Sequence, residues 1–387
     1  MSGNQPSETN TEDTFTLHTI EEAIADIKAG KVVIVVDDED RENEGDFICA
    51  AECVTPEIIN FMAMHGRGLI CAPIDEKRAD ELELDMMVSS NTALHETAFT
   101  VSIDLIGHGC TTGISAYDRA TGIRKLVDPD TKPSDYARPG HIFPLRAKSG
   151  GVLRRTGHTE AAIDLARLAG FKPAGVLVEI LNEDGTMARL PQLVEIAEHF
   201  DLKLIAIKDL VAYRMRNERL IKREVTAALE TPYGDFEVTA FRQITTGDIH
   251  LAFKKGSWAP DEPVLVRVHS STETGEVLGS VFGDYGLQLR NAIQLISKEE
   301  KGLLLYMRHG EKADAILYYL MEFQRKRENG EEVEIEKRPE MTQRDFGVGA
   351  QILRDMGISK MRLISNSSRR RIGLIGYGLE IVDNVQL

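Results

Sequence analysis

An apolar run that ends directly in a cluster of acids limits how this chain can fold more than any other feature. Residues 32–36 read VVIVV, and residues 37–46 read DDEDRENEGD, with seven carboxylates in ten positions. The apolar run predicts a buried strand, and the acids cannot follow it into the core. Two interpretations are open: a solvated turn, or a binding loop at the end of a strand, where α/β folds place their ligands.

Patterns typical of strands and helices alternate through the first half of the chain. Apolar residues at helical spacing predict a helix that begins at a Thr19–Glu22 capping box and ends at Gly30. The other clear elements are a helix and three strands, at residues 190–200, 47–51, 175–181 and 202–207. Alternation of this kind predicts a layered α/β domain.

The chain is expected to have four parts. A polar tail at residues 1–14 is predicted to be disordered, and the first domain covers residues 15–212. The linker is placed at residues 213–224, inside a charged stretch with helical character at 209–225. The second domain, 225–387, begins with the alternating pattern of antiparallel strands and ends in a strand, a polar loop, a short helix and a strand.

Composition narrows the classes of protein and the compartment. The net charge of −16 argues against a broad nucleic-acid-binding surface, which would be basic. Apolar runs stay well below the roughly 18 residues of a membrane helix, and residues 1–14 lack the features of a signal peptide, so we expect a cytoplasmic protein without membrane contact. The four cysteines, Cys49, Cys53, Cys71 and Cys110, lack paired metal-ligand spacing and are expected to be reduced.

Three other segments carry groups that complement the acidic loop. Arg154 and Arg155 stand in a loop just before a predicted helix, and a helix N-terminus with basic neighbours is a ready site for an anion. His141 lies between two prolines, which makes a rigid setting for one imidazole. Glu179 falls inside a predicted buried strand, where a carboxylate needs a partner or a shifted pKa.

The motifs at these positions resemble those of the 3,4-dihydroxy-2-butanone-4-phosphate synthase family of riboflavin biosynthesis. Five motifs carry the resemblance in order: DDEDRENEGDFICAAE, GCTTGISAYDR, TKPSDYARPGHIFPLRA, RRTGHTEAAIDLARLAGF and EILNEDGTMARLPQL. The resemblance spans roughly residues 15 to 212. It implies an N-terminal layered αβα domain with a mixed sheet. The expected activity is that of a lyase, which converts D-ribulose 5-phosphate to 3,4-dihydroxy-2-butanone 4-phosphate and formate through a metal-stabilised enediolate. The resemblance also implies a homodimer.

The resemblance also implies a role for each site residue. Mg²⁺ or Mn²⁺ is expected as the cofactor, with Glu42 and His158 as its protein ligands. His141 and Glu179 match the two residues required for catalysis. The substrate is expected to contact Arg41, Glu42, Asp46, Arg155, Thr156, Gly157, His158, Thr159 and Glu179, with Arg155 and Thr159 at the phosphate. Thr112 and Cys71 are given supporting roles near the substrate.

Two segments of the second half read VLVRVHSSTETGEVLGSVFGDYGLQL and LLLYMRHGEK. They resemble motifs of GTP cyclohydrolase II, a smaller α+β domain, and the resemblance runs from about residue 225 to the end. The three zinc-binding cysteines of that family correspond here to Thr272, Gly283 and Tyr285, and the chain has no cysteine after Cys110. A thiolate site cannot be built from a hydroxyl, a hydrogen and a phenol, so we expect no zinc and an inactive domain.

Three readings of the role of the second half stay open. It could be a folded remnant kept for solubility or assembly, it could sense a nucleotide through Arg267, Arg344 and Arg369 to Arg371, or it could have an activity that its motifs do not reveal. The alternative for the whole chain is a bifunctional enzyme that also has GTP cyclohydrolase II activity.

Overall fold

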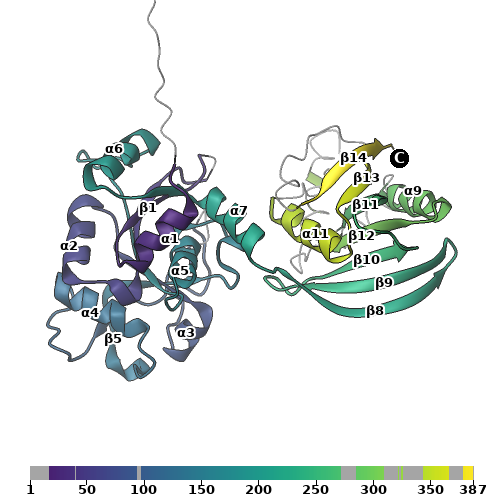
Figure 1. The fold of residues 1–387 in the computed structure, drawn as a ribbon. Helices are drawn as coiled ribbons and strands as arrows, with labels where there is room; N and C mark the ends of the chain where they lie inside the picture. The colour runs from purple at the N-terminus through teal and green to yellow at the C-terminus, as the bar shows by residue number, and fades with distance from the viewer. Residues whose placement is uncertain are drawn as a thin grey trace, which may run out of the picture. The chain divides into compact units, whose positions relative to one another are not determined.

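The computed structural model describes residues 17–39, 41–93, 97–271, 285–308, 321, 324–325, 343–365 and 378–386. Contacts divide the chain into two compact units, Met1–Tyr213 and Arg214–Leu387 (Figure 1). The predicted tail at residues 1–14 and the predicted short helix near the C-terminus lie outside the described residues. The domain limits given above remain predictions, and each unit is described by itself.

The first unit is built on a seven-stranded mixed sheet with the order β4-β5-β3-β6-β2-β1-β7. Its strands are β1 (Val33–Val36), β2 (Gly45–Ala50), β3 (Cys71–Asp75), β4 (Ile103–Leu105), β5 (Tyr136–Ala147), β6 (Gly175–Glu179) and β7 (Leu204–Ala206). The β1–β7 and β3–β5 pairs are parallel, whereas β2 runs antiparallel to both of its neighbours. Because parallel and antiparallel pairs both occur, the predicted mixed sheet is confirmed.

Helices cover both faces of this sheet. They are α1 (Ile20–Lys28), α2 (Pro56–His65), α3 (Glu76–Glu81), α4 (Ala116–Leu126), α5 (His158–Leu168), α6 (Leu190–Phe200) and α7 (Ile207–Asn217), the last crossing the boundary between the units. α5 contacts five strands of the sheet and also α1. On the other face, Phe47 and Cys49 of β2 belong to a core that includes Ile59 of α2 and Ile123 of α4. The layered αβα architecture is therefore as predicted.

Local sequence signals explain where these elements begin. Thr19 caps α1, its side chain accepts a hydrogen bond from the Glu22 amide, and the Glu22 carboxylate accepts one from the Thr19 amide. This reciprocal capping box satisfies two of the amide groups that a helix start leaves open. β1 is fully buried, as its run of Val and Ile residues predicts.

The strand register places the functional residues in one row. Asp46 pairs with Val35 on one side and with Glu179 on the other. Cys71 of β3 pairs with Phe143 of β5 and with Leu177 of β6. Directly paired residues point to the same face, and so do residues two positions apart along a strand. A step of two residues along each strand from Phe143, Cys71 and Leu177 leads to His141, Leu69 and Glu179. These three residues, with Asp46 paired to Glu179, therefore form one row on the same face of the sheet.

The second unit also has a seven-stranded mixed sheet, with the order β14-β13-β11-β12-β10-β9-β8. Its elements are β8 (Ile221–Thr231), β9 (Gly234–Gln243), β10 (Ile249–Lys255), β11 (Pro263–Ser271), α9 (Tyr285–Lys298), β12 (Gly302–Arg308), α11 (Gln343–Asp355), β13 (Lys360–Ile364) and β14 (Glu380–Val385). Ile296 of α9 packs into a core with Phe236, Leu265 and Leu304. The α+β class predicted for this half is confirmed.

One local prediction is wrong in part. The charged stretch at 209–225 was expected to be helical, but α7 ends at Asn217 and β8 begins at Ile221. β8 forms a long hairpin with β9, and these backbone hydrogen bonds outweigh the helical propensity of the charged residues. As for membranes, none of the described helices has both the length and the apolar character needed to span one.

A core substitution tests this architecture. Ile34 of β1 is fully buried between β2 and β7, so Ile34→Ala should lower the free energy of unfolding by about 2–5 kcal/mol. Urea denaturation followed by circular dichroism measures the change. Met64→Ala, at a side chain that is 57% exposed, is the control and should cost no more than about 0.5 kcal/mol. Equal losses for both variants would contradict the placement of β1 in the core.

Candidate active site

The loop after β1 is organised by the first of its acids. The Asp37 side chain is 1% exposed and lies 2.7 Å from the Arg41 guanidinium. Its Oδ1 accepts the Glu44 amide at 2.9 Å, and its Oδ2 accepts the Glu42 amide at 3.2 Å. A buried carboxylate is stable only when it is paired and hydrogen-bonded in this way. Asp37 therefore folds the acidic loop back on itself and fixes Glu42.

A second residue holds the same loop from outside. Arg189, at the start of α6, donates from one guanidinium nitrogen to the Glu42 carbonyl at 2.9 Å and also to the Asn43 carbonyl. Asn43 has a φ of 54°, a left-handed conformation that Asn tolerates better than most residues. The loop is thus fixed at both its side chains and its carbonyls, so it is not the solvated turn that composition alone allowed.

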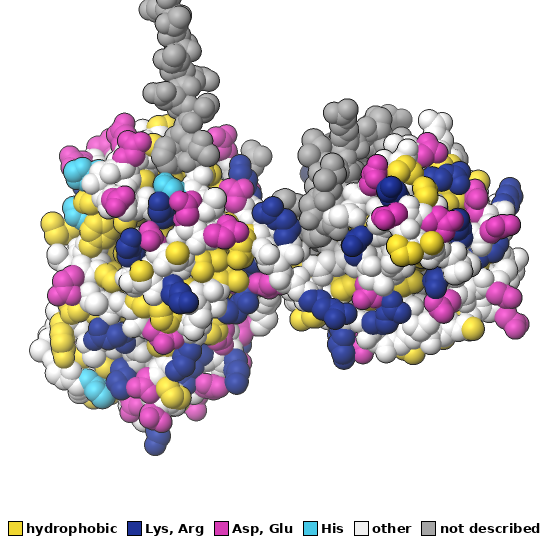
Figure 2. Space-filling model, viewed as in Figure 1, with side chains coloured by type: hydrophobic (Ala, Val, Ile, Leu, Met, Phe, Trp, Pro, Cys, Tyr) yellow, Lys and Arg dark blue, Asp and Glu magenta, His cyan; other side chains and the backbone are white. Residues whose placement is uncertain are grey.

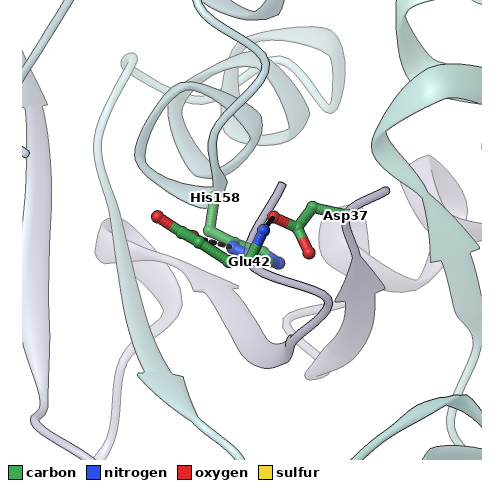
Figure 3. Close-up of side chains that lie close together, drawn as sticks. All are labelled: Asp37, Glu42 and His158. Atoms are coloured by element: carbon green, nitrogen blue, oxygen red, sulfur yellow. Dashed lines mark hydrogen bonds and ion pairs between the residues drawn. The ribbon is translucent and has the colours of Figure 1, made fainter. Parts of the chain in front are cut away.

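His158, the first residue of α5, faces this loop (Figure 3). Its Nε2 lies 3.1 Å from the Val35 carbonyl, which only accepts, so Nε2 carries the hydrogen. Its Nδ1 lies 3.8 Å from Glu42 Oε2 and 4.0 Å from Asp46 Oδ1. Histidine ligands of metals commonly donate their second nitrogen to a backbone carbonyl. Nδ1 is therefore the atom of His158 placed to bind a cation.

Three groups at this point lie close enough to share one ion. Ligand atoms of Asp37, Glu42 and His158 are all within 4.8 Å of one another (Figure 3). The sequence predicted Glu42 and His158 as ligands and left Asp37 without a role. Because both oxygens of Asp37 already accept hydrogen bonds, we regard it as the residue that positions Glu42 rather than as a third ligand.

Electrostatics at the cluster favour a bound cation. Burial alone would raise the pKa of Glu42, but His158 and Arg41 outweigh it and lower this pKa to about 2. Burial alone would lower the pKa of His158, but Asp46, Glu42 and Asp37 raise it to about 9. At neutral pH the free protein therefore holds a proton on His158, where its positive charge faces the carboxylates.

Asp46 is also buried in the cluster. Burial, helped by the charges of Glu179, Glu44 and Glu42, raises its pKa to about 7 against the opposing effect of His158. Its Oδ1 is buried and accepts no hydrogen bond within the part of the chain that the structure describes. A buried oxygen left without a donor costs free energy, which a cation or a substrate hydroxyl would recover.

Glu179 joins the cluster from the end of β6. Its Oε2 accepts the Leu69 amide at 2.9 Å. The approach depends on Gly68, because a β-carbon there would overlap the Glu179 carboxylate. His141, in the same row of the sheet, is 46% exposed and pairs through Nδ1 with Asp104 at 2.7 Å. The two predicted catalytic residues thus lie on one face of the sheet, each held by a neighbour that the sequence did not reveal.

The predicted phosphate-binding segment forms the N-terminus of α5. Arg155 makes an ion pair with the buried Glu160 at 2.7 Å and donates to Thr97 Oγ1 at 3.3 Å. Thr156 and Gly157 precede the helix, and a β-carbon at Gly157 would overlap the Arg155 guanidinium. Thr159, in the first turn, is buried. The helix dipole and Arg155 together suit a negatively charged group at this point.

The two residues given supporting roles differ in their surroundings. Cys71 is buried in β3, and burial with the charges of Glu179 and Asp46 raises the pKa of its thiol. Such a thiol is a poor nucleophile, and the supporting role given to Cys71 stays a prediction. Thr112 is exposed in a loop whose neighbours Thr111 and Gly113 are both held by Asp118.

Comparisons with known families agree with this geometry. The family model of 3,4-dihydroxy-2-butanone 4-phosphate synthase matches residues 21–213, and that of GTP cyclohydrolase II matches residues 222–386. The riboflavin biosynthesis protein RibBA of Cytophaga hutchinsonii is 61% identical over 373 residues, which are 96% of this chain and 92% of that protein. RibBA of Porphyromonas gingivalis is 54% identical over the same shares of the two chains.

Solved structures are similar as well. RibBX, a two-domain 3,4-dihydroxy-2-butanone 4-phosphate synthase from A. baumannii, is 39% identical with a TM-score of 0.75, and the match covers 95% of this chain and 99% of that one. A 3,4-dihydroxy-2-butanone 4-phosphate synthase in complex with two magnesium ions is 44% identical with a TM-score of 0.50, over 52% of this chain and 98% of that one.

Fold and site together define a layered α/β enzyme whose acidic strand end and buried histidine offer ligands that suit a divalent cation. The chain belongs to the 3,4-dihydroxy-2-butanone 4-phosphate synthase family and carries a second domain of the GTP cyclohydrolase II family. The resemblance found in the sequence is thereby confirmed, while the roles of individual site residues stay predictions.

Binding of Mn²⁺ to the free protein should depend on pH. His158, with its pKa of about 9, must lose a proton before Nδ1 can bind the ion. Release of one proton raises the affinity by about tenfold per pH unit below pH 9, and Asp46 steepens the rise below about pH 7. Calorimetry in buffers of different ionisation enthalpy measures both the affinity and the protons released.

Variants separate the ligands from the surrounding charge. Glu42→Gln and His158→Ala should each remove detectable Mn²⁺ binding while the circular dichroism spectrum is preserved. Asp130→Asn, at an exposed carboxylate of the same unit, is the matched control and should bind like wild type. An affinity that does not change with pH, or that survives His158→Ala, would contradict the site.

Proposed function

We propose that the first unit converts D-ribulose 5-phosphate to 3,4-dihydroxy-2-butanone 4-phosphate and formate in riboflavin biosynthesis. Family membership supports the reaction, and the observation that carries it is the joint placement of Glu42, Asp46, Glu179 and His158 beside the N-terminus of α5. This arrangement offers acids and a cation site for a hydroxylated chain, next to a basic helix start for its phosphate.

A divalent cation fits the residues present. Carboxylate oxygens and one imidazole suit Mg²⁺ or Mn²⁺, and the buried Asp46 Oδ1, which accepts no hydrogen bond from the described residues, is an oxygen that a cation could satisfy. In the proposal Glu42 and His158 Nδ1 hold the ion, in line with the magnesium ions of the similar synthase structure. When bound, the ion supplies Lewis-acid stabilisation of negative charge on the sugar oxygens.

The side chains of this chain supply the remaining chemistry. A proton must leave a carbon next to the ketone, a hydroxyl is then lost, the carbon skeleton rearranges and formate departs, so proton donors and acceptors act repeatedly. Glu179 has one oxygen fixed by the Leu69 amide, which leaves the other to take or give a proton. His141 serves as the second such group, from the same face of the sheet. Arg41, between Asp37 and Glu42, keeps the acidic loop in the geometry that the sugar contacts.

Arg155 and Thr159 are assigned to the phosphate. The Glu160 carboxylate, which also accepts the Lys148 amide, holds the Arg155 guanidinium over Gly157 at the start of α5. Figure 2 shows Lys and Arg side chains interspersed with Asp and Glu on each unit in this view, rather than gathered into a basic face. A local anion site within a mixed surface fits a small sugar phosphate better than a nucleic acid.

We also propose a homodimer of the full chain, which the family resemblance supports. Several apolar side chains of the first unit are exposed and available for such an interface: Met86, Met87, Val88, Ile106, Ile114 and Tyr117. Large apolar groups on a surface commonly mark contacts with another protein.

Activity assays test the synthase assignment. Wild type with Mg²⁺ should release formate from D-ribulose 5-phosphate, and Glu179→Gln or His141→Ala should lower kcat by about 100-fold or more because each removes a proton-transfer group. Both variants should still bind Mn²⁺, since neither is a ligand. Arg155→Ala should act mainly on KM. Wild-type turnover by Glu179→Gln under saturating metal would refute its catalytic role.

For the second unit we propose that GTP cyclohydrolase II activity has been lost. The absence of cysteine after Cys110 supports this loss. Of the positions matched to the zinc ligands, Thr272 and Gly283 lie outside the described residues, and the side chain of Tyr285 is not described. RibBX, described as a two-domain synthase, is consistent with it. The nucleotide-sensing alternative gains little, since Arg267 is buried and donates to the Ile364 carbonyl at 2.9 Å; the side chains of Arg344 and Arg369 to Arg371 are not described.

A bifunctional enzyme is the second candidate, and the comparisons favour it. The GTP cyclohydrolase II model matches almost the whole second unit, and the relatives that are 54–61% identical are named RibBA. The two candidates differ in one chemical requirement, a zinc centre with about three protein ligands and an open position for water.

The purified full chain decides between them. We expect far less than one zinc ion per chain, because the thiolate ligands of a zinc centre are missing, and no formate from GTP with or without added Zn²⁺. The control is formate from D-ribulose 5-phosphate in the same preparation, which shows that the protein is active. One tightly held zinc per chain together with formate from GTP would establish the bifunctional enzyme instead.

A further inference from the structure

His141 has a carboxylate partner that the sequence analysis did not find. Asp104 of β4 meets His141 of β5 twice: its Oδ2 lies 2.7 Å from the ring Nδ1, and its Oδ1 accepts the His141 backbone amide at 2.8 Å. We propose that Asp104 is a positioning residue that sets the tautomer and the orientation of His141. The inference rests on the proposed synthase function, in which His141 transfers protons.

The chemistry of the pair fixes which ring nitrogen is reactive. An ionised carboxylate only accepts hydrogen bonds, so the nitrogen that faces Asp104 carries the hydrogen and Nδ1–H donates to Oδ2. The lone pair then resides on Nε2, on the opposite edge of the ring. The imidazole is 46% exposed and its Nδ1 edge faces Asp104, so Nε2 is the nitrogen that we assign to the substrate side. A neutral imidazole in this tautomer can take a proton through Nε2, and the carboxylate stabilises the imidazolium that forms.

The second contact restricts the ring further. Asp104 Oδ1 accepts the backbone amide of His141, and Asp104 Oδ2 pairs with the ring of the same residue. One carboxylate therefore fixes both the backbone and the side chain of His141. Next to it, Ser102 Oγ accepts the Gly140 amide at 3.1 Å, and a β-carbon at Gly140 would overlap the backbone of Ile103 and Asp104. The close approach of β4 and β5 therefore leaves the imidazole few orientations.

Asp104 is itself held from a third segment. Gly113, with a φ of +90°, lies so close that a β-carbon would overlap the Asp104 carboxylate. Asp118, in the first turn of α4, fixes this loop by accepting hydrogen bonds from the Gly113 amide at 3.0 Å and from the Thr111 hydroxyl at 2.9 Å. The loop that carries Thr112 and the imidazole of His141 are thus aligned through one carboxylate.

Substitution of Asp104 by Asn tests the role. An Asn can present its NH₂ group to Nδ1, which then must accept, and the proton moves to Nε2. We expect Asp104→Asn to lower kcat by about 10²–10⁴-fold, as removal of an orienting carboxylate does elsewhere. KM and Mn²⁺ affinity should stay within about threefold, since the phosphate and cation sites are untouched. Asp130→Asn is the matched control and should keep wild-type kcat.

The tautomer of the His141 ring distinguishes a positioning role of Asp104 from a merely structural one. NMR of protein labelled with ¹⁵N-histidine, with the His141 signal assigned through His141→Gln, should show Nδ1–H in wild type and Nε2–H in Asp104→Asn. Asp104→Glu retains a charged acceptor and should restore the Nδ1–H tautomer and part of the lost kcat. This variant also keeps the test decisive if Asp104→Asn fails to fold.

Two results would overturn the inference. One is a wild-type ring that carries its hydrogen on Nε2. The other is kcat within about threefold of wild type for Asp104→Asn despite a changed tautomer. The tautomer is measured without substrate, so it tests the Asp104–His141 pairing even if wild type were to release no formate from ribulose 5-phosphate, an outcome that would refute the proposed function alone.

Discussion

The site depends on one buried carboxylate at the point where a strand leaves the core. Asp37 follows the fully buried β1, and both of its carboxylate oxygens accept hydrogen bonds from its own loop. The donors are the amides of Glu42 and Glu44 and the guanidinium of Arg41. Without these partners a carboxylate at 1% exposure would be strongly unfavourable. The hydrogen bonds and the ion pair of Asp37 therefore allow a charged loop to follow directly on a buried strand. The same contacts fix the backbone of Glu42.

The sheet provides the frame for everything else. Asp46, Glu179 and His141 come from β2, β6 and β5, and they face one side because the register aligns them in one row. A slip of one residue in any of these strands would send its acid or imidazole to the opposite face, into the core that contains Phe47 and Ile59. α5, which packs against the sheet, places His158 next to Asp46 of that row. Its Nε2 donates to the Val35 carbonyl, and its Nδ1 is the atom proposed to bind a cation.

Much of this could be predicted from the sequence where the signal was local. The capping box at Thr19, the buried β1 and the acidic loop are read within a few residues, and family motifs pointed to Glu42 and His158. The partners that position these groups could not be found in the same way. Asp104 lies 37 residues from His141 in a strand of three residues, and Arg189 reaches Glu42 across 147 residues. Such pairs depend on which distant strands and loops become neighbours, and the pattern within one segment does not reveal that.

The helical stretch expected at 209–225 failed for a related reason. Its charged residues favour a helix locally, but from Ile221 onward the backbone pairs with β9, and this long-range partner decides the structure. Local propensity was therefore reliable where neighbours in sequence supplied the stabilisation, as in α1, and unreliable where a distant strand supplied it.

The central claim is that the acidic end of β1 and the first residue of α5 hold one divalent cation between them. Crystals of the protein grown with Mn²⁺ and measured for anomalous scattering test it most directly. The account predicts a peak bound by a Glu42 carboxylate oxygen and by Nδ1 of His158, with Nε2 still donating to the Val35 carbonyl. A peak on Nε2, or one elsewhere with Glu42 and His158 left in contact with each other, would contradict it.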